Sequence, residues 1–378
     1  MAKHKRRTAL LTALLILSLW GCSARETAEV SVRTQTETRS VTVEVPSAET
    51  EPPTTEETQP PTTEETQPPT TEETQPPEER YTITFAGDCT FGGTDALRSA
   101  GVGFPKTVGE DYDYPFRNVQ CYFADDDLTL VNLEGPLLDQ GVPSPGKTFN
   151  FRGSTAYTRI LTEGSVEAVG FTNNHTMDYG KAGYQSTLDA LDAEGIPYVE
   201  RDSYRILTLG ENFRVGIYGT QFPSDTEGLL AGIAKMLAEG VDFSVLDVHW
   251  GTEYSYTPSA NQVRIAHEVI DAGVNVIWGQ HPHVLQPIEQ YGDGIIFYSV
   301  GNFCFGGNSK PRDFDSVVIQ LQLVRKADGT VEREQVDVHP VCISSNPKTN
   351  NYQPTPYDPG SEAYARTLEK LSWTEGNQ

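Results

Sequence analysis

Residues 274–307, VNVIWGQHPHVLQPIEQYGDGIIFYSVGNFCFGG, contain two apolar runs, and each run ends in a polar motif. The first run ends at Trp278-Gly279 and is followed by His281-Pro282-His283. Because side chains repeat every second residue in an extended segment, and Pro282 disfavours a helix, we expect both imidazoles to point the same way. Two such histidines directly after a buried strand can bind a metal ion, although solvated loop histidines are an equally good interpretation of these residues alone.

The same pattern, an apolar run followed by a polar group, occurs four more times earlier in the chain. The runs are residues 81–86, 128–131, 166–171 and 243–248. The polar groups that follow them are Asp88, Glu134, Asn174-His175 and His249. Helical patterns at 183–193 and 258–272 alternate with these runs, which is typical of an α/β protein. Because parallel strands end at one edge of a sheet, we expect these groups to converge with His281 and His283.

The chemistry of these side chains limits the kind of cofactor. A mixture of carboxylate, amide and imidazole ligands indicates a divalent metal such as Mn, Fe, Zn or Mg, rather than a soft site built only from cysteine. The cysteines after Cys22 are Cys89, Cys121, Cys304 and Cys342. Outside the cytoplasm these four could pair in three ways or remain free thiols, and the sequence does not choose.

The first residues of the chain predict an export signal. A basic start is followed by the apolar run Ala9 to Trp20, which is short for a membrane span. Leu19-Trp20-Gly21-Cys22 resembles a bacterial lipobox, in which the cysteine is lipidated and becomes the mature N-terminus. We therefore expect residues 1–22 to be a lipoprotein signal peptide and the protein to be extracytoplasmic, lipid-anchored to the cell membrane through Cys22. An ordinary signal peptide and an uncleaved anchor are the alternatives.

Residues 23–80 have almost no core-forming sequence and include three copies of PPTTEETQ in residues 52–75. Proline and repeated like charge keep such a segment extended, and it cannot bury enough apolar surface to fold, so we expect a disordered stalk. The formal net charge of the chain is −25. This acidity argues against a nucleic-acid partner, because binding to phosphates needs a basic surface.

Motifs in the predicted folded part, residues 81 to 342, resemble those of the CapA family of poly-γ-glutamate capsule biosynthesis proteins, which is related to the calcineurin-like metallophosphoesterases. They are Ala86-Gly87-Asp88, Tyr114-Pro115-Phe116, Asn132 to Leu137, Asn173-Asn174-His175 with Asp178-Tyr179-Gly180, His249-Trp250-Gly251 with Glu253-Tyr254, Gly279 to Val284, and Tyr298 to Phe303. The chain departs from the metallophosphoesterase pattern at Thr90, where Asp-x-His would have histidine, and at Glu134, where that pattern has aspartate.

The resemblance implies a four-layer α/β/β/α sandwich, in which two mixed sheets are flanked by helices and the metal site lies at the strand ends. By analogy, one or two metal ions would be held by Asp88, Glu134, Asn174, His249, His281 and His283. His175 would be the outer-sphere acid that protonates a leaving oxygen or steadies an attacked phosphate. We expect this domain to span residues 81–345, followed by a C-terminal tail, residues 346–378, with one short helix.

Two functions are compatible with these features. The first is a surface-anchored, metal-dependent hydrolase that acts on a phosphoester or on an envelope polymer. The second is a non-catalytic, metal-stabilised factor that binds or helps export an anionic polymer such as poly-γ-glutamate, with other capsule-synthesis proteins as further candidate partners. Arg152 is the candidate anion clamp, because a guanidinium pairs bidentately with carboxylate or phosphate, and a surface loop arginine is the alternative. Asn132 is the second candidate substrate contact.

Overall fold

The structure, a computed structural model, describes residues 78–374. The expected signal peptide, the lipidation site Cys22 and the expected stalk up to residue 77 lie outside the described residues, as does the end of the chain from residue 375. Among residues 78–374, no helix combines the length and the apolar character needed to cross a membrane.

The first sheet has eight strands in the order β14-β13-β12-β1-β2-β3-β4, and β11 also pairs with β1. Its strands are β1 (Glu79–Thr90), β2 (Leu128–Leu133), β3 (Ala168–Phe171), β4 (Tyr198–Glu200), β11 (Asn302–Phe305), β12 (Asp315–Arg325), β13 (Val331–Cys342) and β14 (Thr355–Pro356). Strands β1 to β4 run parallel, whereas β12 and β13 are antiparallel to their neighbours. The sheet is therefore mixed.

The second sheet has six strands in the order β5-β6-β7-β8-β10-β9. They are β5 (Ser203–Leu209), β6 (Phe213–Gln221), β7 (Phe243–His249), β8 (Val276–Gln280), β9 (Ile288–Tyr291) and β10 (Gly294–Phe297). The four central strands are parallel, and the two edge strands β5 and β9 are antiparallel. Both sheets thus contain parallel and antiparallel strands, as the resemblance implies.

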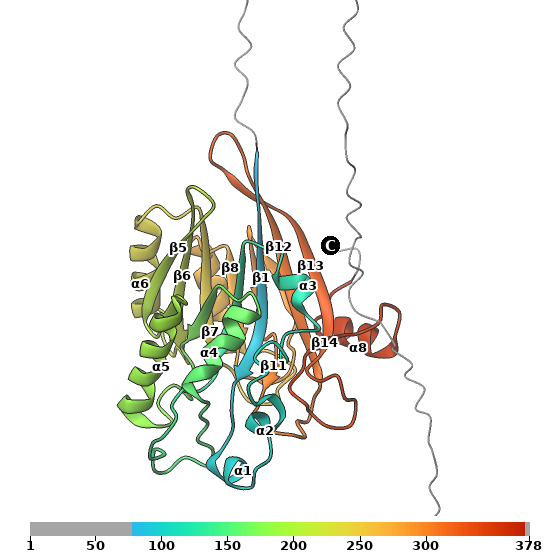
Figure 1. The fold of residues 1–378 in the computed structure, drawn as a ribbon. Coiled ribbons are helices and arrows are strands. Elements are labelled where there is room, and N and C mark those ends of the chain that lie inside the picture. The colour runs from blue at the N-terminus through green and yellow to red at the C-terminus, as the bar shows by residue number, and fades with distance from the viewer. Residues whose placement is uncertain (1–77, 375–378) are drawn as a thin grey trace, which may run out of the picture. The chain divides into compact units, whose positions relative to one another are not determined.

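Three apolar layers hold the sheets and helices together. Between the sheets lie side chains such as Phe85, Leu130, Val245 and Trp278, and the indole nitrogen of Trp278 donates to the Ala86 carbonyl oxygen at 3.1 Å. Outside the first sheet, α4 (Thr158–Glu163) and α5 (Gly180–Glu194) pack on β2 and β3. Outside the second, α6 (Glu227–Ala238) and α7 (Ala260–Asp271) pack on β7 and β8, and Figure 1 shows α6 beyond β5 and β6. The predicted α/β/β/α sandwich is confirmed.

Several short elements were not predicted: α1 (Asp95–Ser99), α2 (Phe104–Val108), α3 (Gln120–Phe123), the 3₁₀ helix η1 (Thr155–Tyr157), β9 and β14. They are too short for an apolar period to be visible in the sequence. The expected C-terminal helix is α8 (Glu362–Lys370). Leu368, Leu371 and Trp373 join the core between the sheets, and β14 pairs with β13, so residues 346–374 pack as part of the same unit.

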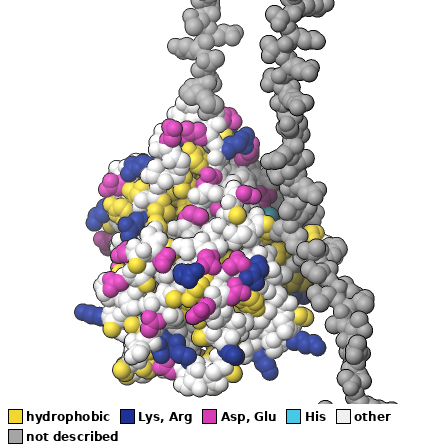
Figure 2. Space-filling model, viewed as in Figure 1, with side chains coloured by type: hydrophobic (Ala, Val, Ile, Leu, Met, Phe, Trp, Pro, Cys, Tyr) yellow, Lys and Arg dark blue, Asp and Glu magenta, His cyan; other side chains and the backbone are white. Residues whose placement is uncertain are grey.

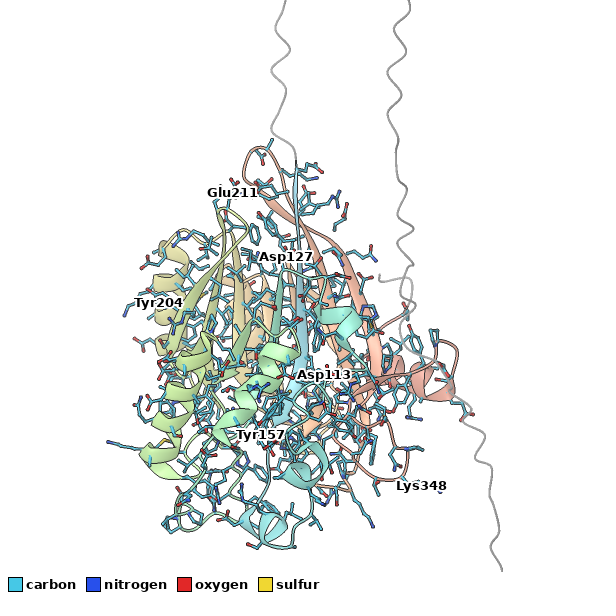
Figure 3. The ribbon with its side chains drawn as sticks, in the orientation of Figure 1. Asp113, Asp127, Tyr157, Tyr204, Glu211 and Lys348 are labelled. Atoms are coloured by element: carbon cyan, nitrogen blue, oxygen red, sulfur yellow. The ribbon has the colours of Figure 1, made fainter. Side chains whose placement is uncertain are left out.

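The two ends of the first sheet differ in what they carry. Asp127, which precedes β2, lies in the upper half of the domain in Figure 3, and Tyr157 lies in the lower half. The parallel strands run away from Asp127, so their carboxyl ends lie at the end that carries the polar motifs. Acidic and basic side chains are interspersed over the face shown in Figure 2, which has no extended basic area of the kind that nucleic-acid binding needs.

Candidate metal centre

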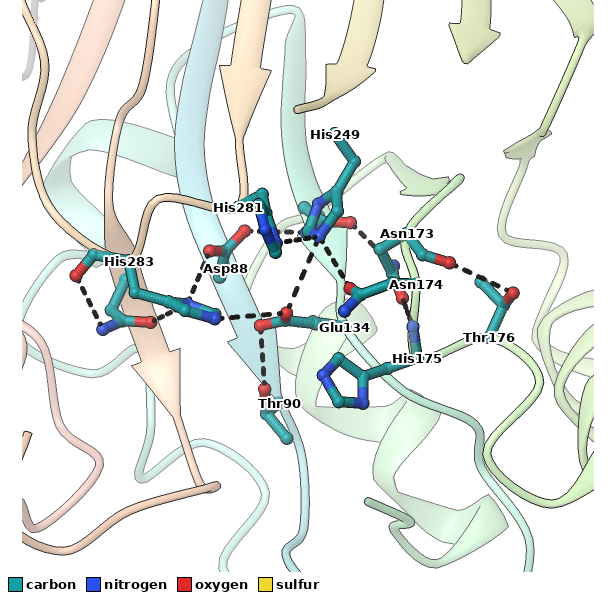
Figure 4. A network of polar contacts seen from close by, with 12 residues as sticks. Asp88, Thr90, Glu134, Asn173, Asn174, His175, Thr176, His249, His281 and His283 are labelled. Atoms are coloured by element: carbon teal, nitrogen blue, oxygen red, sulfur yellow. Dashed lines mark hydrogen bonds and ion pairs between the residues drawn. The ribbon is translucent and has the colours of Figure 1, made fainter. Parts of the chain in front are cut away.

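The polar groups that follow β1, β2, β3, β7 and β8 come together at one end of the two sheets (Figure 4). Asp88 lies near the end of β1 and pairs in register with Asn132 of β2. His249 is the last residue of β7 and pairs in register with Gln280, the residue before His281. Because the parallel strands of both sheets end on the same side of the core, residues far apart in the chain share this site.

Two carboxylates and one imidazole form the first half of the site. The Nδ1 atom of His283 is 3.2 Å from Asp88 Oδ2, and its Nε2 atom is 3.7 Å from Glu134 Oε1. One ligand atom from each of these three buried residues lies within 4.8 Å of the other two. Asp88 Oδ2 and Glu134 Oε1 are buried but accept no hydrogen bond from any of the described residues, 78–374. Buried carboxylate oxygens without donors are rare and suit a bound cation, so these residues fit a divalent metal.

His249 is at the centre of the second half. Its Nε2 atom is 2.9 Å from Asn174 Oδ1, 3.1 Å from His281 Nδ1 and 3.9 Å from Glu134 Oε1. Glu134 therefore lies between the two halves, at a similar distance from His283 and His249. Its other oxygen accepts the Thr90 hydroxyl at 3.3 Å, so the threonine that replaces the histidine of Asp-x-His supports Glu134.

Burial and charge set the protonation of the site. Burial raises the pKa of Glu134 to about 7, against the opposing effect of His283. Burial, with the neighbouring imidazoles acting in the same direction, lowers the pKa of His281 to about 4 and that of His249 well below its usual value. At His283 burial acts to lower the pKa, but Glu134 and Asp88 raise it to about 10. His249 and His281 are therefore neutral, as metal ligands must be, whereas His283 is charged and would have to release its proton to bind a metal ion.

Three asparagines hold these groups in place. Asn132 Nδ2 donates to Asp88 Oδ1 at 2.7 Å, and Asn132 Oδ1 accepts from Asn173 Nδ2 at 2.9 Å. Asn302 of β11 has its Oδ1 3.0 Å from His283 Nδ1. Asn132, which we expected to contact the substrate, is fully buried, and both ends of its amide bind protein groups. Asn173 and Asn302 were not predicted as site residues, although both occur in the motifs that carry the resemblance.

His175 lies next to Asp178, with its Nδ1 atom 2.7 Å from Asp178 Oδ2. The same carboxylate accepts from the Phe151 backbone N–H at 2.6 Å and is paired with Lys147. The Phe151 ring packs on the imidazole, with the centroids 4.5 Å apart. The Nε2 atom of His175 has no hydrogen-bond partner among residues 78–374. The ring is thus held from one side and leaves one nitrogen available.

The expected extended conformation of His281-Pro282-His283 is wrong. His281 and His283 have φ values of 97° and 56°, so the chain bends at both residues once β8 has ended. The bend is held because the Tyr254 N–H donates to the Pro282 carbonyl oxygen at 2.7 Å. The two rings still face the site, with centroids 5.8 Å apart, but for a different reason from strand alternation.

Two further residues with positive φ line the same site. Phe222 has φ 42° and its ring centroid is 4.7 Å from that of His281. Tyr254 has φ 62° and its ring centroid is 6.3 Å from that of His283. Large side chains adopt this conformation only where the surroundings enforce it, and such strain concentrates at functional sites. Neither residue was predicted to be part of the site.

Arg152 makes a different set of contacts from the one we expected. Its Nε donates to Asp95 Oδ1 at 3.1 Å and its Nη1 donates to the Leu138 carbonyl oxygen at 3.0 Å. Its guanidinium also lies over the Tyr179 ring. None of these partners is a residue of the cluster, so a role in substrate binding stays a prediction.

Of the cysteines whose state the sequence left open, three are free thiols: Cys89, Cys304 and Cys342. Cys89 and Cys304 are fully buried, and burial raises the pKa of both thiols. They pack as small apolar side chains below the site.

The family model described as bacterial capsule synthesis protein PGA_cap matches residues 82–307. The capsule biosynthesis protein CapA of Bacillus anthracis is 30% identical over 275 residues, which are 65% of this chain and 64% of the relative. The PGA biosynthesis protein CapA of Bacillus subtilis (strain 168) is 32% identical over 251 residues, which are 60% of this chain and 66% of the relative. The chain thus spans just under two thirds of the length of these relatives.

Solved structures show a weaker likeness. The NAD nucleotidase of Haemophilus influenzae has a TM-score of 0.42 at 13% identity, covering 79% of this chain and 63% of that chain. The purple acid phosphatase from yellow lupin seeds has a TM-score of 0.31 at 13% identity, covering 69% of this chain and 53% of that chain. Both TM-scores are below 0.5, and we draw no functional conclusion from them.

Proposed function

Because the chain belongs to the bacterial capsule synthesis family PGA_cap, we propose that it is a metal-dependent hydrolase of the cell envelope that acts on an anionic polymer or a phosphoester. The observation that carries this proposal is the pair of buried oxygens, Asp88 Oδ2 and Glu134 Oε1, that accept no hydrogen bond beside three histidines. A buried carboxylate without partners is costly, and a divalent cation would supply the missing charge.

The donor set suggests how metal would be held. Asp88 and His283 would ligate on one side, His249, His281 and Asn174 on the other, and Glu134 is near enough to both to be shared. When bound, divalent metal supplies positive charge that polarises the substrate and lowers the pKa of a water molecule. Asn132 and Asn302 would keep Asp88 and His283 oriented, as hydrogen-bond partners of metal ligands commonly do.

His175 would act as the general acid. Asp178 would bind the Nδ1 hydrogen and stabilise the charged ring, which leaves Nε2 as the proton donor. In hydrolysis water adds to the phosphorus or carbonyl carbon and releases a proton to solvent, the bond to the leaving oxygen or nitrogen breaks, and that atom takes the proton from His175, which is then protonated again from solvent. Phe151, packed on the ring, would limit its movement.

A non-catalytic envelope factor is the second candidate, and one observation favours it. Thr90 occupies the place of a histidine ligand in the metallophosphoesterase pattern and binds Glu134 instead. In that case metal would stabilise a domain that binds or helps export an anionic polymer. For either function we propose that residues 1–22 direct the protein to the outer side of the membrane and that Cys22 carries the lipid.

The test compares His175→Ala with wild type in metal content and in hydrolysis of p-nitrophenyl phosphate and a γ-linked glutamate oligomer. We expect metal content to stay unchanged and hydrolysis to fall by about 10²- to 10⁴-fold, the usual contribution of general acid catalysis. His267→Ala is the matched control, because His267 of α7 pairs with Glu289 of β9 and not with a residue of the cluster, so both quantities should stay unchanged. Bound metal with no hydrolysis by wild type would favour the non-catalytic factor, and wild type without metal would contradict both.

A further inference from the structure

Arg312 differs from the other arginines of residues 78–374, because its guanidinium has no hydrogen bond or ion pair with any of these residues. Every other arginine in this range donates to a carboxylate, amide or carbonyl oxygen. Arg312 instead lies over the Tyr254 ring, with its Cζ atom 4.4 Å from the ring centroid. All five N–H groups of this exposed guanidinium are available, and they match the geometry of an oxyanion.

Tyr254 places this guanidinium next to the candidate metal centre. Its ring is a neighbour of the His283 ring, and its backbone N–H is bonded to Pro282 between the two histidines. Its φ of 62° is unfavourable for a tyrosine and persists only because the surrounding contacts hold it. The loop after β7 is therefore tied to the bend that carries His281 and His283, and Arg312 contacts this loop through the Tyr254 ring.

The segment that carries Arg312 is also anchored. The Tyr256 hydroxyl donates to Asp313 Oδ2 at 2.9 Å, which links this segment to the loop of Tyr254. Asp315 pairs with both Arg366 and Lys370 of α8. The backbone around Arg312 is thus fixed from two sides, while its own side chain has no polar partner in the part of the chain that the structure describes. Arg312 lies outside residues 82–307, so the family match does not cover it.

We infer that Arg312, positioned by Tyr254, binds an oxyanion of the substrate beside the metal centre, either a carboxylate of a γ-linked glutamate chain or a phosphate. This inference rests on the proposed function. The carboxylates of Asp88 and Glu134 would offset much of the charge of a bound metal ion, so a cation outside the cluster adds to the attraction for an anionic substrate. In a γ-linked glutamate chain a free carboxylate lies next to every amide bond. When one amide bond lies at the metal centre, the Arg312 guanidinium would bind the carboxylate next to that bond. Arg152 is less suited, since Asp95 and the Leu138 carbonyl already use its donors.

The test measures binding of inorganic phosphate and of a γ-linked glutamate oligomer to the metal-loaded, detergent-solubilised full chain by calorimetry. Arg312→Ala should weaken binding of the probe that wild type recognises by about 10- to 100-fold, the contribution of hydrogen bonds to a charged group. The affinity of Arg312→Lys should lie between those of wild type and Arg312→Ala, because an ammonium group does not bind bidentately. Tyr254→Leu should weaken binding and Tyr254→Phe should retain it, since only the ring supports the guanidinium. Metal content should be unchanged throughout.

Arg159→Ala is the matched control. Arg159 lies over the Tyr112 ring at 4.3 Å, almost as Arg312 lies over Tyr254, but it pairs with Glu163 on α4. Loss of oligomer binding alone would support the carboxylate, and loss of phosphate binding alone would support phosphate. Unchanged binding of both probes by Arg312→Ala would overturn the inference and leave the proposed function standing. Wild type that holds metal but binds neither probe would overturn the anionic substrate of the proposed function as well.

Discussion

Replacing Glu134 by glutamine should lower the stability of the metal-bound protein far more than that of the metal-free protein. The side chain is almost completely buried, and glutamine has nearly the same shape. The amide oxygen can still accept the Thr90 hydroxyl. What the substitution removes is the negative charge beside Asp88 and one candidate ligand that lies between the two halves of the site.

The magnitudes follow from the contacts. Without metal, the substitution ends the repulsion between the buried carboxylates of Asp88 and Glu134 but also removes a negative charge that raises the pKa of His283, so the two effects oppose each other and the Tm should change little. With metal at a hundredfold excess over its Kd, wild type should gain about 2.7 kcal/mol from binding, and the variant should lose most of that gain. For a domain of this size each kcal/mol corresponds to a Tm change of roughly 2–4 °C.

The assay is a pair of thermal melts for each protein, one after chelation and one after titration with Mn or Zn, with metal content measured on the same samples. Glu163→Gln, which removes a half-exposed carboxylate paired with Arg159 on α4, is the matched control and should shift neither melt appreciably. If metal raises the Tm of the Glu134→Gln variant as much as that of wild type, Glu134 is not a ligand. A variant that is destabilised after chelation would show that the carboxylate itself supports the fold.

Four further predictions concern the rest of the chain. Cys22→Ser should abolish membrane association in cell fractionation, and persistence of that association would mean an uncleaved anchor. Deletion of the three PPTTEETQ repeats, residues 52–75, should leave the Tm unchanged, whereas a drop of several degrees would mean that they pack on the domain. Burial raises the pKa of Asp126 from 3.8 to about 6, so the folded state keeps a proton that the unfolded state releases, and stability falls as pH rises through this window. Asp126→Asn should remove this fall. In urea titrations at pH 7 its free energy of unfolding should exceed that of wild type by about 1 kcal/mol, a figure reduced for the partial exposure of the side chain. Parallel pH profiles of the two proteins would contradict this. Trp373→Ala should lower the free energy of unfolding by about 3–5 kcal/mol, because Trp373 packs in the core between the sheets. A decrease no larger than that caused by Trp373→Phe would mean that α8 contributes little to folding.

Much of the fold could be predicted because its evidence is local. A parallel strand that is covered on both faces needs a continuous apolar run, and the runs that became β1, β2, β3, β7 and β8 are visible without knowledge of their neighbours. Short elements such as α1 and β14 could not be found in this way. They form because the surrounding chain packs around them, and their few residues show no period.

For the candidate site, too, one part could be predicted from the sequence and another could be seen only in the structure. By itself the sequence determined which chemical groups follow the strands, since Asp88, Glu134, His249 and the His281-Pro282-His283 motif each stand at the end of an apolar run. Only the tertiary structure decided that Asn302 supports His283, because β11 lies beside β1 through pairing between distant parts of the chain. It also decided that the guanidinium of Arg152 donates to Asp95, whereas that of Arg312 has no hydrogen-bond partner among residues 78–374. Whether a donor is already used depends on atoms about 3 Å away in space, and distance along the chain carries no such information.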